Sequence, residues 1–250
     1  MLTNLQKRTA QAIVNVFETG SPVGDYANIT AAPADPGHLT YGRSQTTLSS
    51  GNLALLIKSY CNSSGLPPAA GLRSYLPRLE SRDASLDSDP NLRSLLRQAA
   101  ADQAMRRAQD EFFDRDYWHP AVHAAQSLAI DSPLGTAVVY DSFIHGAWSR
   151  LRDATLARLG LPAASSKSAW IREYVTLRRD WLATHPNPLL HRAVYRMDTF
   201  HALIAAANWD LRLPLVAHGV SISEASLSKP ADNSPARPGF PIQSIRVKTD

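Results

Sequence analysis

Two stretches decide the fold: Val16-Phe17-Glu18-Thr19-Gly20 and Asp35-Pro36-Gly37-His38-Leu39-Thr40-Tyr41-Gly42. Glu18 closes an apolar helix that Gly20 and Pro22 end, so its carboxyl lies where a helix opens into a loop. Asp35 directly precedes Pro36-Gly37, which places it in a turn. One carboxyl is partly walled by apolar neighbours, and the other stands in a polar loop. Such a contrast separates the pKa values of two carboxyls, so that one serves as acid and the other as base.

The composition predicts a chain with a real hydrophobic core. It has 250 residues, 44% of them hydrophobic, with a mean hydropathy of -0.23. No apolar run reaches the roughly 18 residues of a membrane span. Gln6-Lys7-Arg8 interrupts the first helix and no long apolar stretch follows, so we expect no signal peptide. Cys61 is the single cysteine and lies on an apolar helix face, which predicts a structural thiol.

The charge balance favours an anionic partner. The formal net charge is +4, from 26 basic and 22 acidic residues, and the isoelectric point is near 9.3. The arginines are scattered through helices without an aromatic-interleaved basic stripe, which argues against nucleic-acid binding. An acidic polysaccharide or cell-wall polymer fits the charge at least as well.

The pattern along the chain predicts a mainly helical α+β domain over residues 1–227, followed by a Pro/Ser-rich tail at 228–250. Residues 21–49 carry prolines, glycines and two short β-prone runs, Tyr26–Thr30 and Leu39–Tyr41, which predict a small irregular lobe.

Two helices stand out in the rest of the chain. Asp89-Pro90 provides an N-cap and a first-turn proline for what we expect to be the longest helix, which runs to about Tyr117. The helix predicted over Pro133–His145 is apolar enough to be the buried one.

Further segments occur in one order along the chain: Ala108–Glu111, Asp114–Val122, Tyr140–Gly146, Arg178-Arg179, Tyr195–Thr199 and Ala207–Leu211. Together with the two opening stretches they resemble the family 46 glycoside hydrolases, the chitosanases with a lysozyme-like fold. The likeness spans residues 1 to about 222. It implies a two-lobed, lysozyme-like fold with a small irregular or β lobe and a larger helical lobe.

The resemblance implies roles for the opening residues. Glu18 would be the general acid that protonates the glycosidic oxygen, and Asp35 the general base that activates a water on the opposite face of the sugar. Thr40 would help to position that water. Inverting enzymes of this kind hold their two carboxyls roughly 6.5–9.5 Å apart to make room for the water.

The resemblance also implies a buried charge relay of Asp141, Arg178 and Arg196 that reaches Glu18. Without it, these three read as ordinary ion-pair residues. We further expect Tyr41 and His145, which lie in matched segments, to contact the substrate.

The substrate expectation rests on departures from the family. Asn52 stands where the family has a carboxylate that holds a glucosamine amine, and an amide suits an N-acetyl group better. Gly37 replaces a loop arginine. With the basic charge, these changes favour peptidoglycan as substrate of an inverting endo-hydrolase, a muramidase-like lysin or antibacterial effector that acts outside the cytoplasm. An effector would have an immunity or inhibitor protein as partner.

Two alternatives stay open. The first is a chitosanase that acts on chitosan, and the second is a non-catalytic module that binds glycan or a partner protein.

Other chemistries have weaker signals. His119 and His123 have a zinc-like spacing, but no Glu follows His119 and no third ligand is evident, so we expect no metal. The chain has no Gly-x-Ser-x-Gly motif and no Gly-rich phosphate loop. We therefore expect no cofactor.

Overall fold

A computed structural model describes residues 2–31, 36–43, 45–162 and 166–228. Asp35 and the predicted tail from residue 229 onward lie outside the described residues. The chain forms two compact units, which we describe separately. Unit 1 comprises Met1–Gly24 and Tyr117–Asp250, and unit 2 comprises Asp25–Asp116.

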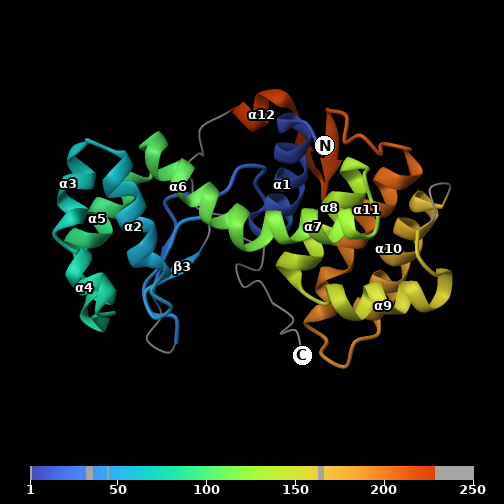
Figure 1. The fold of residues 1–250 in the computed structure, drawn as a ribbon, viewed down its shortest axis with the longest axis horizontal. Helices are drawn as coiled ribbons and strands as arrows, with labels where there is room; N and C mark the ends of the chain where they lie inside the picture. The colour runs from blue at the N-terminus through green and yellow to red at the C-terminus, as the bar shows by residue number, and fades with distance from the viewer. Residues whose placement is uncertain (1, 32–35, 44, 163–165, 229–250) are drawn as a thin grey trace. The chain divides into compact units, whose positions relative to one another are not determined.

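Unit 1 is helical and is built around α8 (Pro133–His145), which contacts α1, α7, α9, α10 and α11 (Figure 1). Every residue of α8 except Phe143 is buried, which confirms the expectation of a buried helix. The other elements of the unit are α1 (Asn4–Thr19), α7 (His119–Ser127), α9 (Trp148–Leu159), α10 (Lys167–Ala183), η3 (Leu190–Ala193), α11 (Val194–Ala205), β4 (Leu215–Ala217), β5 (Val220–Ile222) and α12 (Glu224–Ser228).

Helix α1 sets the position of Glu18. It begins with a capping box, in which Thr3 and Gln6 bond each other's backbone N–H groups at 3.2 and 2.9 Å. Its apolar face, which includes Ile13 and Phe17, is buried, and the helix packs on α8. Glu18 therefore lies in the last turn, fixed by packing of the residues before it.

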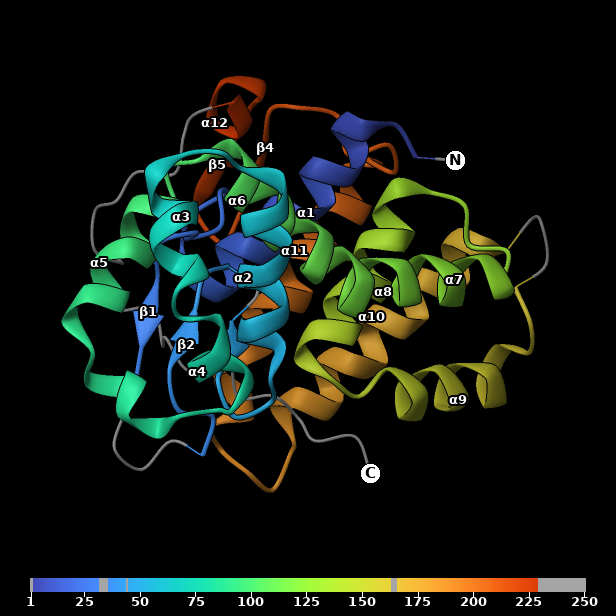
Figure 2. The same cartoon turned by 60° about the vertical axis from the view of Figure 1, so that its left-hand side comes forward.

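Unit 2 combines a small sheet with helices, and Figure 2 brings it forward. The antiparallel strands run in the order β1-β2-β3, with Thr30 opposite Thr40 and Tyr41 opposite Thr46. The sheet and the helices share one core of buried apolar side chains. The elements are β1 (Ile29–Thr30), β2 (Thr40–Tyr41), β3 (Thr46–Thr47), α2 (Asn52–Ser63), α3 (Pro67–Arg73), α4 (Leu76–Glu80), η1 (Ala84–Ser88), α5 (Pro90–Ala99) and α6 (Gln103–Phe113).

The prediction of one long helix from Asp89 to about Tyr117 is wrong. The structure has α5, then a break, then α6, then a π-helical turn, η2 (Asp114–Trp118). Asp102 causes the break, because its side chain accepts from the N–H of Ala104 at 2.9 Å and caps a new helix. Its other oxygen accepts from Ser64 Oγ at 2.6 Å, a tertiary contact that the helical period does not encode.

Two smaller expectations concern α2 and membranes. Cys61 is buried in α2 and its thiol donates to the carbonyl of Ala69 at 3.3 Å, as expected of a structural cysteine.

Among the helices that the structure describes, none has the length and apolar character needed to cross a bilayer.

Candidate active site

Glu18 is held by an arginine from the far end of the chain. Arg196, in α11, donates from Nη1 to Glu18 Oε1 at 2.8 Å. The Glu18 side chain keeps 23% of its surface exposed, whereas the Arg196 side chain keeps 3%. The carboxyl thus has one face on a buried cation and another open to an incoming molecule.

Behind Arg196 the charges alternate. Arg196 donates to Asp141 Oδ1 from Nε at 3.0 Å and from Nη2 at 2.5 Å. Arg178 donates to the other oxygen, Oδ2, at 2.7 Å and to Ser142 Oγ at 2.7 Å. The side chains of Asp141 and Arg178 are fully buried. The structure therefore brings Asp141, Arg178 and Arg196, the relay that the resemblance implied, together with Glu18.

The field of the two arginines fixes the protonation of the buried groups. Burial alone would raise the pKa of Asp141, but Arg196 and Arg178 hold it below its usual value. Arg196 is also desolvated, yet Asp141 and Glu18 raise its pKa further. Burial and both arginines push the pKa of His145 well below 6.5. Hence Asp141 stays anionic and His145 stays neutral near pH 7.

An aromatic cluster holds the end of α1 beside this ion chain. The Phe17 ring lies edge-on to Tyr195 and to Phe200, each at 5.7 Å between centroids. The Arg196 guanidinium sits over the Phe17 ring at 4.9 Å, and the Tyr195 hydroxyl donates to the Phe17 carbonyl at 2.7 Å. His218 stacks on Tyr195 at 3.9 Å. These contacts fix the backbone immediately before Glu18.

Among the other predicted residues, Thr40 and Tyr41 lie in unit 2 and His145 lies in unit 1. Thr40, in β2, is 9% exposed and its hydroxyl donates to the His38 carbonyl at 3.2 Å. Tyr41 has no exposed surface and donates to the Leu96 carbonyl at 2.8 Å. Its side chain is therefore part of the core of unit 2. His145, in unit 1, is likewise buried, at 4% exposure, with Nδ1 facing Arg178 Nη2 at 3.3 Å. Both side chains are buried, which disfavours the expected role of Tyr41 and His145 as substrate contacts.

Two residues that the sequence analysis missed support the loop around Thr40. Asp87, in η1, accepts from the Leu39 N–H at 2.7 Å and contacts His38 Nδ1 at 2.7 Å. Gln109, fully buried in α6, accepts from the Arg43 N–H at 2.8 Å and donates to the Tyr26 carbonyl at 3.0 Å. Gln109 lies in a segment that the resemblance had matched, whereas no spacing pattern points to Asp87.

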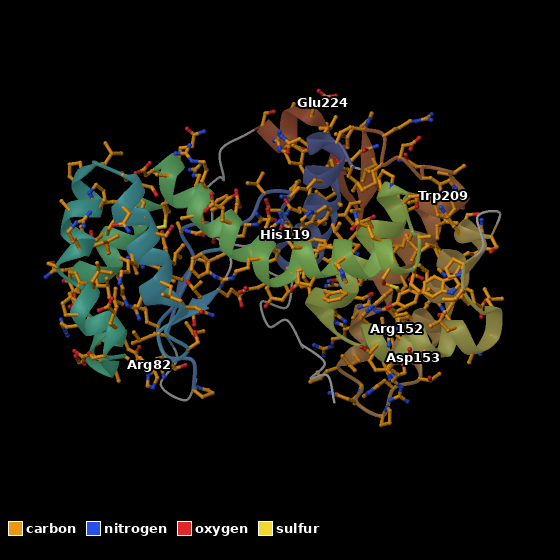
Figure 3. The ribbon with its side chains drawn as sticks, viewed as in Figure 1. Arg82, His119, Arg152, Asp153, Trp209 and Glu224 are labelled. Carbon is orange, nitrogen blue, oxygen red and sulfur yellow. The ribbon has the colours of Figure 1, made fainter. Side chains whose placement is uncertain are left out.

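Asn52 is the first residue of α2, and the glycine before it lies near an arginine. Asn52 is half-buried, and Gly51 before it is the N-cap, with φ of 80°. A Cβ placed on Gly51 would lie 3.5 Å from Nη2 of Arg82, which is labelled in Figure 3. This end of α2 thus carries an amide at its first residue and a guanidinium near its N-cap glycine.

Two other kinds of site, a metal site and a cavity, do not include the expected active-site residues. His119 and His123 lie exposed on α7, and Figure 3 labels His119. In the described ranges, no group of three or more His, Cys, Asp or Glu side chains could hold a metal ion. Unit 1 has a cavity of about 450 Å³ whose lining includes Lys7, Trp118 and Lys167, but none of the expected site residues.

Comparisons with known proteins identify relatives over most of the chain. A chitosanase from Bacillus subtilis strain 168 is 27% identical over 231 residues, covering 84% of this chain and 80% of the relative. The native chitosanase of Bacillus subtilis MY002 has the same fold, with a TM-score of 0.68 and 24% identity, covering 89% of this chain and 100% of that chain. The family 46 chitosanase of Gynuella sunshinyii, solved with chitotetraose, gives a TM-score of 0.66 at 25% identity, covering 89% and 98%. The expectation of a mainly helical, lysozyme-like fold is confirmed.

These relatives correct the substrate expectation. They are chitosanases, and none of these matches supports peptidoglycan as the favoured polymer. The error came from two arguments. Net charge describes the long-range electrostatic field of the whole surface. It does not specify which side chains bind a given sugar unit. Two departures, at Gly37 and Asn52, do not change the other contacts of a long polysaccharide site.

The match extends to a family description. The pattern of glycosyl hydrolase family 46 matches residues 12–215, which include Glu18, Thr40 and the buried ion chain of Asp141, Arg178 and Arg196. The chain is therefore a glycoside hydrolase that acts on polysaccharide, and it belongs to glycosyl hydrolase family 46.

Proposed function

We propose that this protein is a chitosanase, an endo-hydrolase of the β-1,4 bonds between glucosamine units of chitosan. The observation that carries the proposal is the ion chain from Glu18 through Arg196 and Asp141 to Arg178, on a chain whose relatives are chitosanases. The network ends on a carboxyl that is 23% exposed, so this carboxyl has surface with which to contact a substrate.

Glu18 is the general acid of the proposal. Its carboxyl is open on one side, so it reaches a glycosidic oxygen, and Arg196 fixes its orientation on the other. Once the proton has left, Arg196 also stabilises the carboxylate that remains. Asp141 and Arg178 act as positioning residues, because they hold the Arg196 guanidinium without reaching the surface.

Asp35 is the general base, and Thr40 helps to hold the water that it activates. Thr40 lies five residues after Asp35 in the sequence, and β2 holds the backbone of Thr40 between β1 and β3. In this scheme the water attacks the face opposite the acid, and the product is the inverted α-anomer. Because chitosan is a polymer too large to enter a cell intact, we propose that the protein acts outside the cytoplasm.

Digestion of defined polymers tests the proposal. Purified protein is incubated in parallel with chitosan, chitin and peptidoglycan, and the products are identified by mass. Release of short glucosamine oligomers from chitosan supports the proposal. Proton NMR early in the digest reports the anomer, and an initial β product contradicts inversion. If chitosan stays intact under conditions in which another polymer is cut, the proposed substrate is wrong.

A further inference from the structure

A histidine–carboxylate pair lies on the loop before Thr40. His38 Nδ1 lies 2.7 Å from Asp87 Oδ2, and the two side chains are 41% and 28% exposed. An ionised carboxylate only accepts hydrogen bonds. His38 Nδ1 therefore carries a proton and donates a hydrogen bond to Asp87. In the tautomer with its single proton on Nδ1, the ring has its lone pair on Nε2.

The pair is fixed on both sides. Asp87 uses its second oxygen to accept from the Leu39 N–H at 2.7 Å, so one carboxylate holds both the ring of His38 and the backbone next to it. Arg93 donates from Nε and Nη2 to the Asp87 carbonyl at 3.1 and 2.6 Å, which anchors η1. A ring fixed through Nδ1 presents Nε2 in one orientation, and the carboxylate behind it makes Nε2 a stronger acceptor.

The location ties this acceptor to the candidate site. The hydroxyl of Thr40 donates to the carbonyl of His38 at 3.2 Å, so the two residues belong to one short hydrogen-bonded segment. At the start of α2, by contrast, Asn52 and Arg82 offer no negative charge. A polyamine substrate then needs its acceptor at another position of the chain.

We propose that His38, held by Asp87, is a substrate-binding residue whose Nε2 accepts a hydrogen bond from the ammonium group of a glucosamine unit. This inference rests on the proposed chitosanase function and adds to it a specificity contact. His38 reads the free amine, because an ammonium brings three donors and a positive charge to the carboxylate-backed ring, whereas an N-acetyl group brings one neutral donor. Asp87 is a positioning residue that sets the tautomer.

Two substitutions distinguish the proposed hydrogen bond of Nε2 to the substrate from a purely structural role of the His38–Asp87 pair in the loop. His38→Asn keeps a donor for Asp87 and suits the left-handed backbone at this position, where φ is 56°, but it removes Nε2. Asp87→Asn keeps an oxygen for the Leu39 N–H, but its NH₂ group faces Nδ1 and moves the ring proton to Nε2, which then donates. His123→Asn, at an exposed position of α7, is the control.

The readouts are steady-state kinetics on a glucosamine hexamer and calorimetric binding of that hexamer in a Glu18→Gln background. We expect both test variants to raise KM and Kd at least about tenfold, the size of one charge-assisted hydrogen bond, with kcat within about twofold. The melting temperature of His38→Asn stays near that of the wild type, and the control behaves as the wild type. The selectivity for glucosamine over N-acetylglucosamine hexamer falls in both test variants.

The two levels of the proposal fail in different ways. If wild-type protein cleaves the hexamer and His38→Asn leaves KM and selectivity unchanged, His38 does not read the amine. If His38→Asn lowers kcat and the melting temperature with unchanged KM, the pair only supports the loop, and the inference is again wrong. If the wild-type protein neither cleaves nor binds the hexamer, the chitosanase proposal itself fails.

Discussion

Arg196 Nη1 lies 2.8 Å from Glu18 Oε1, across a sequence separation of 178 residues. The same guanidinium bonds Asp141 through Nε and Nη2, so one side chain links the end of α1 to the middle of α8. A buried cation shared by two carboxylates fixes the position of the more exposed one. The predictions below test what this link contributes.

Glu18→Gln should reduce turnover of chitosan by two orders of magnitude or more, since a positioned general acid typically contributes about 10²–10⁴-fold. Glutamine keeps an oxygen for Arg196, so the melting temperature should change little. Glu80→Gln is the matched control, because Glu80 is 52% exposed in a surface pair with Lys58. Turnover is measured as reducing ends released. A Glu18→Gln protein that keeps most of its activity contradicts the assignment.

Arg196→Ala should destabilise the protein by about 3 kcal/mol, because Asp141 keeps Arg178 but loses the other partner of its buried charge. Arg179→Ala removes an exposed pair with Asp198, between α10 and α11, and should cost at most about 1 kcal/mol. Denaturant unfolding of both variants gives the comparison. Equal losses of unfolding free energy in the two variants would show that the buried pair stabilises the protein no more than the exposed pair does.

His145 should make the protein less stable as the solution turns acidic. Its folded pKa lies well below 6.5 because of burial and the charges of Arg196 and Arg178, against the opposing effect of Asp141. Below about pH 6.5 the unfolded chain binds a proton that the folded chain excludes, so the unfolding free energy falls by up to about 1.4 kcal/mol per pH unit.

His145→Asn removes this titration and keeps an acceptor for Arg178. The slope of unfolding free energy against pH, measured by denaturant melts from pH 8 to 5, should therefore be shallower in His145→Asn than in wild type. Parallel slopes would mean that the folded protein accepts a proton on His145.

Gly42→Ala should destabilise unit 2 by clearly more than the cost of its backbone conformation. Gly42 has φ of 73°, and a Cβ there would lie 2.2 Å from Gln109 Oε1. Gly219→Ala is the matched control, because Gly219 has φ of 79° but nothing within 4 Å of the added Cβ. The control should cost only the roughly 1–2 kcal/mol of a left-handed alanine. Equal melting temperatures for the two variants would show that Gln109 moves aside freely.

Local features of the fold could be predicted from the sequence. The apolar character of residues 133–145 on all sides predicted the buried helix α8, and the turn residues Gly20 and Pro22 predicted where α1 ends. These signals depend on neighbours within one or two turns of chain. The break at Asp102 was missed although its cap on the Ala104 N–H is a local signal, whereas its second contact, with Ser64 38 residues away, depends on the fold.

The sequence by itself determined the helical class, the positions of Glu18 and Thr40 and, through the ordered segments that resemble family 46, the residues of the ion chain. Tertiary structure alone decided that Arg196 bonds Glu18 and Asp141 together, that Asp87 fixes His38, and that Tyr41 and His145 are buried. The physical reason is range. Helical period and capping act over a few residues. The contacts of Arg196 with Glu18 and Asp141, and of Asp87 with His38, form only when packing brings together side chains separated by 49 to 178 residues.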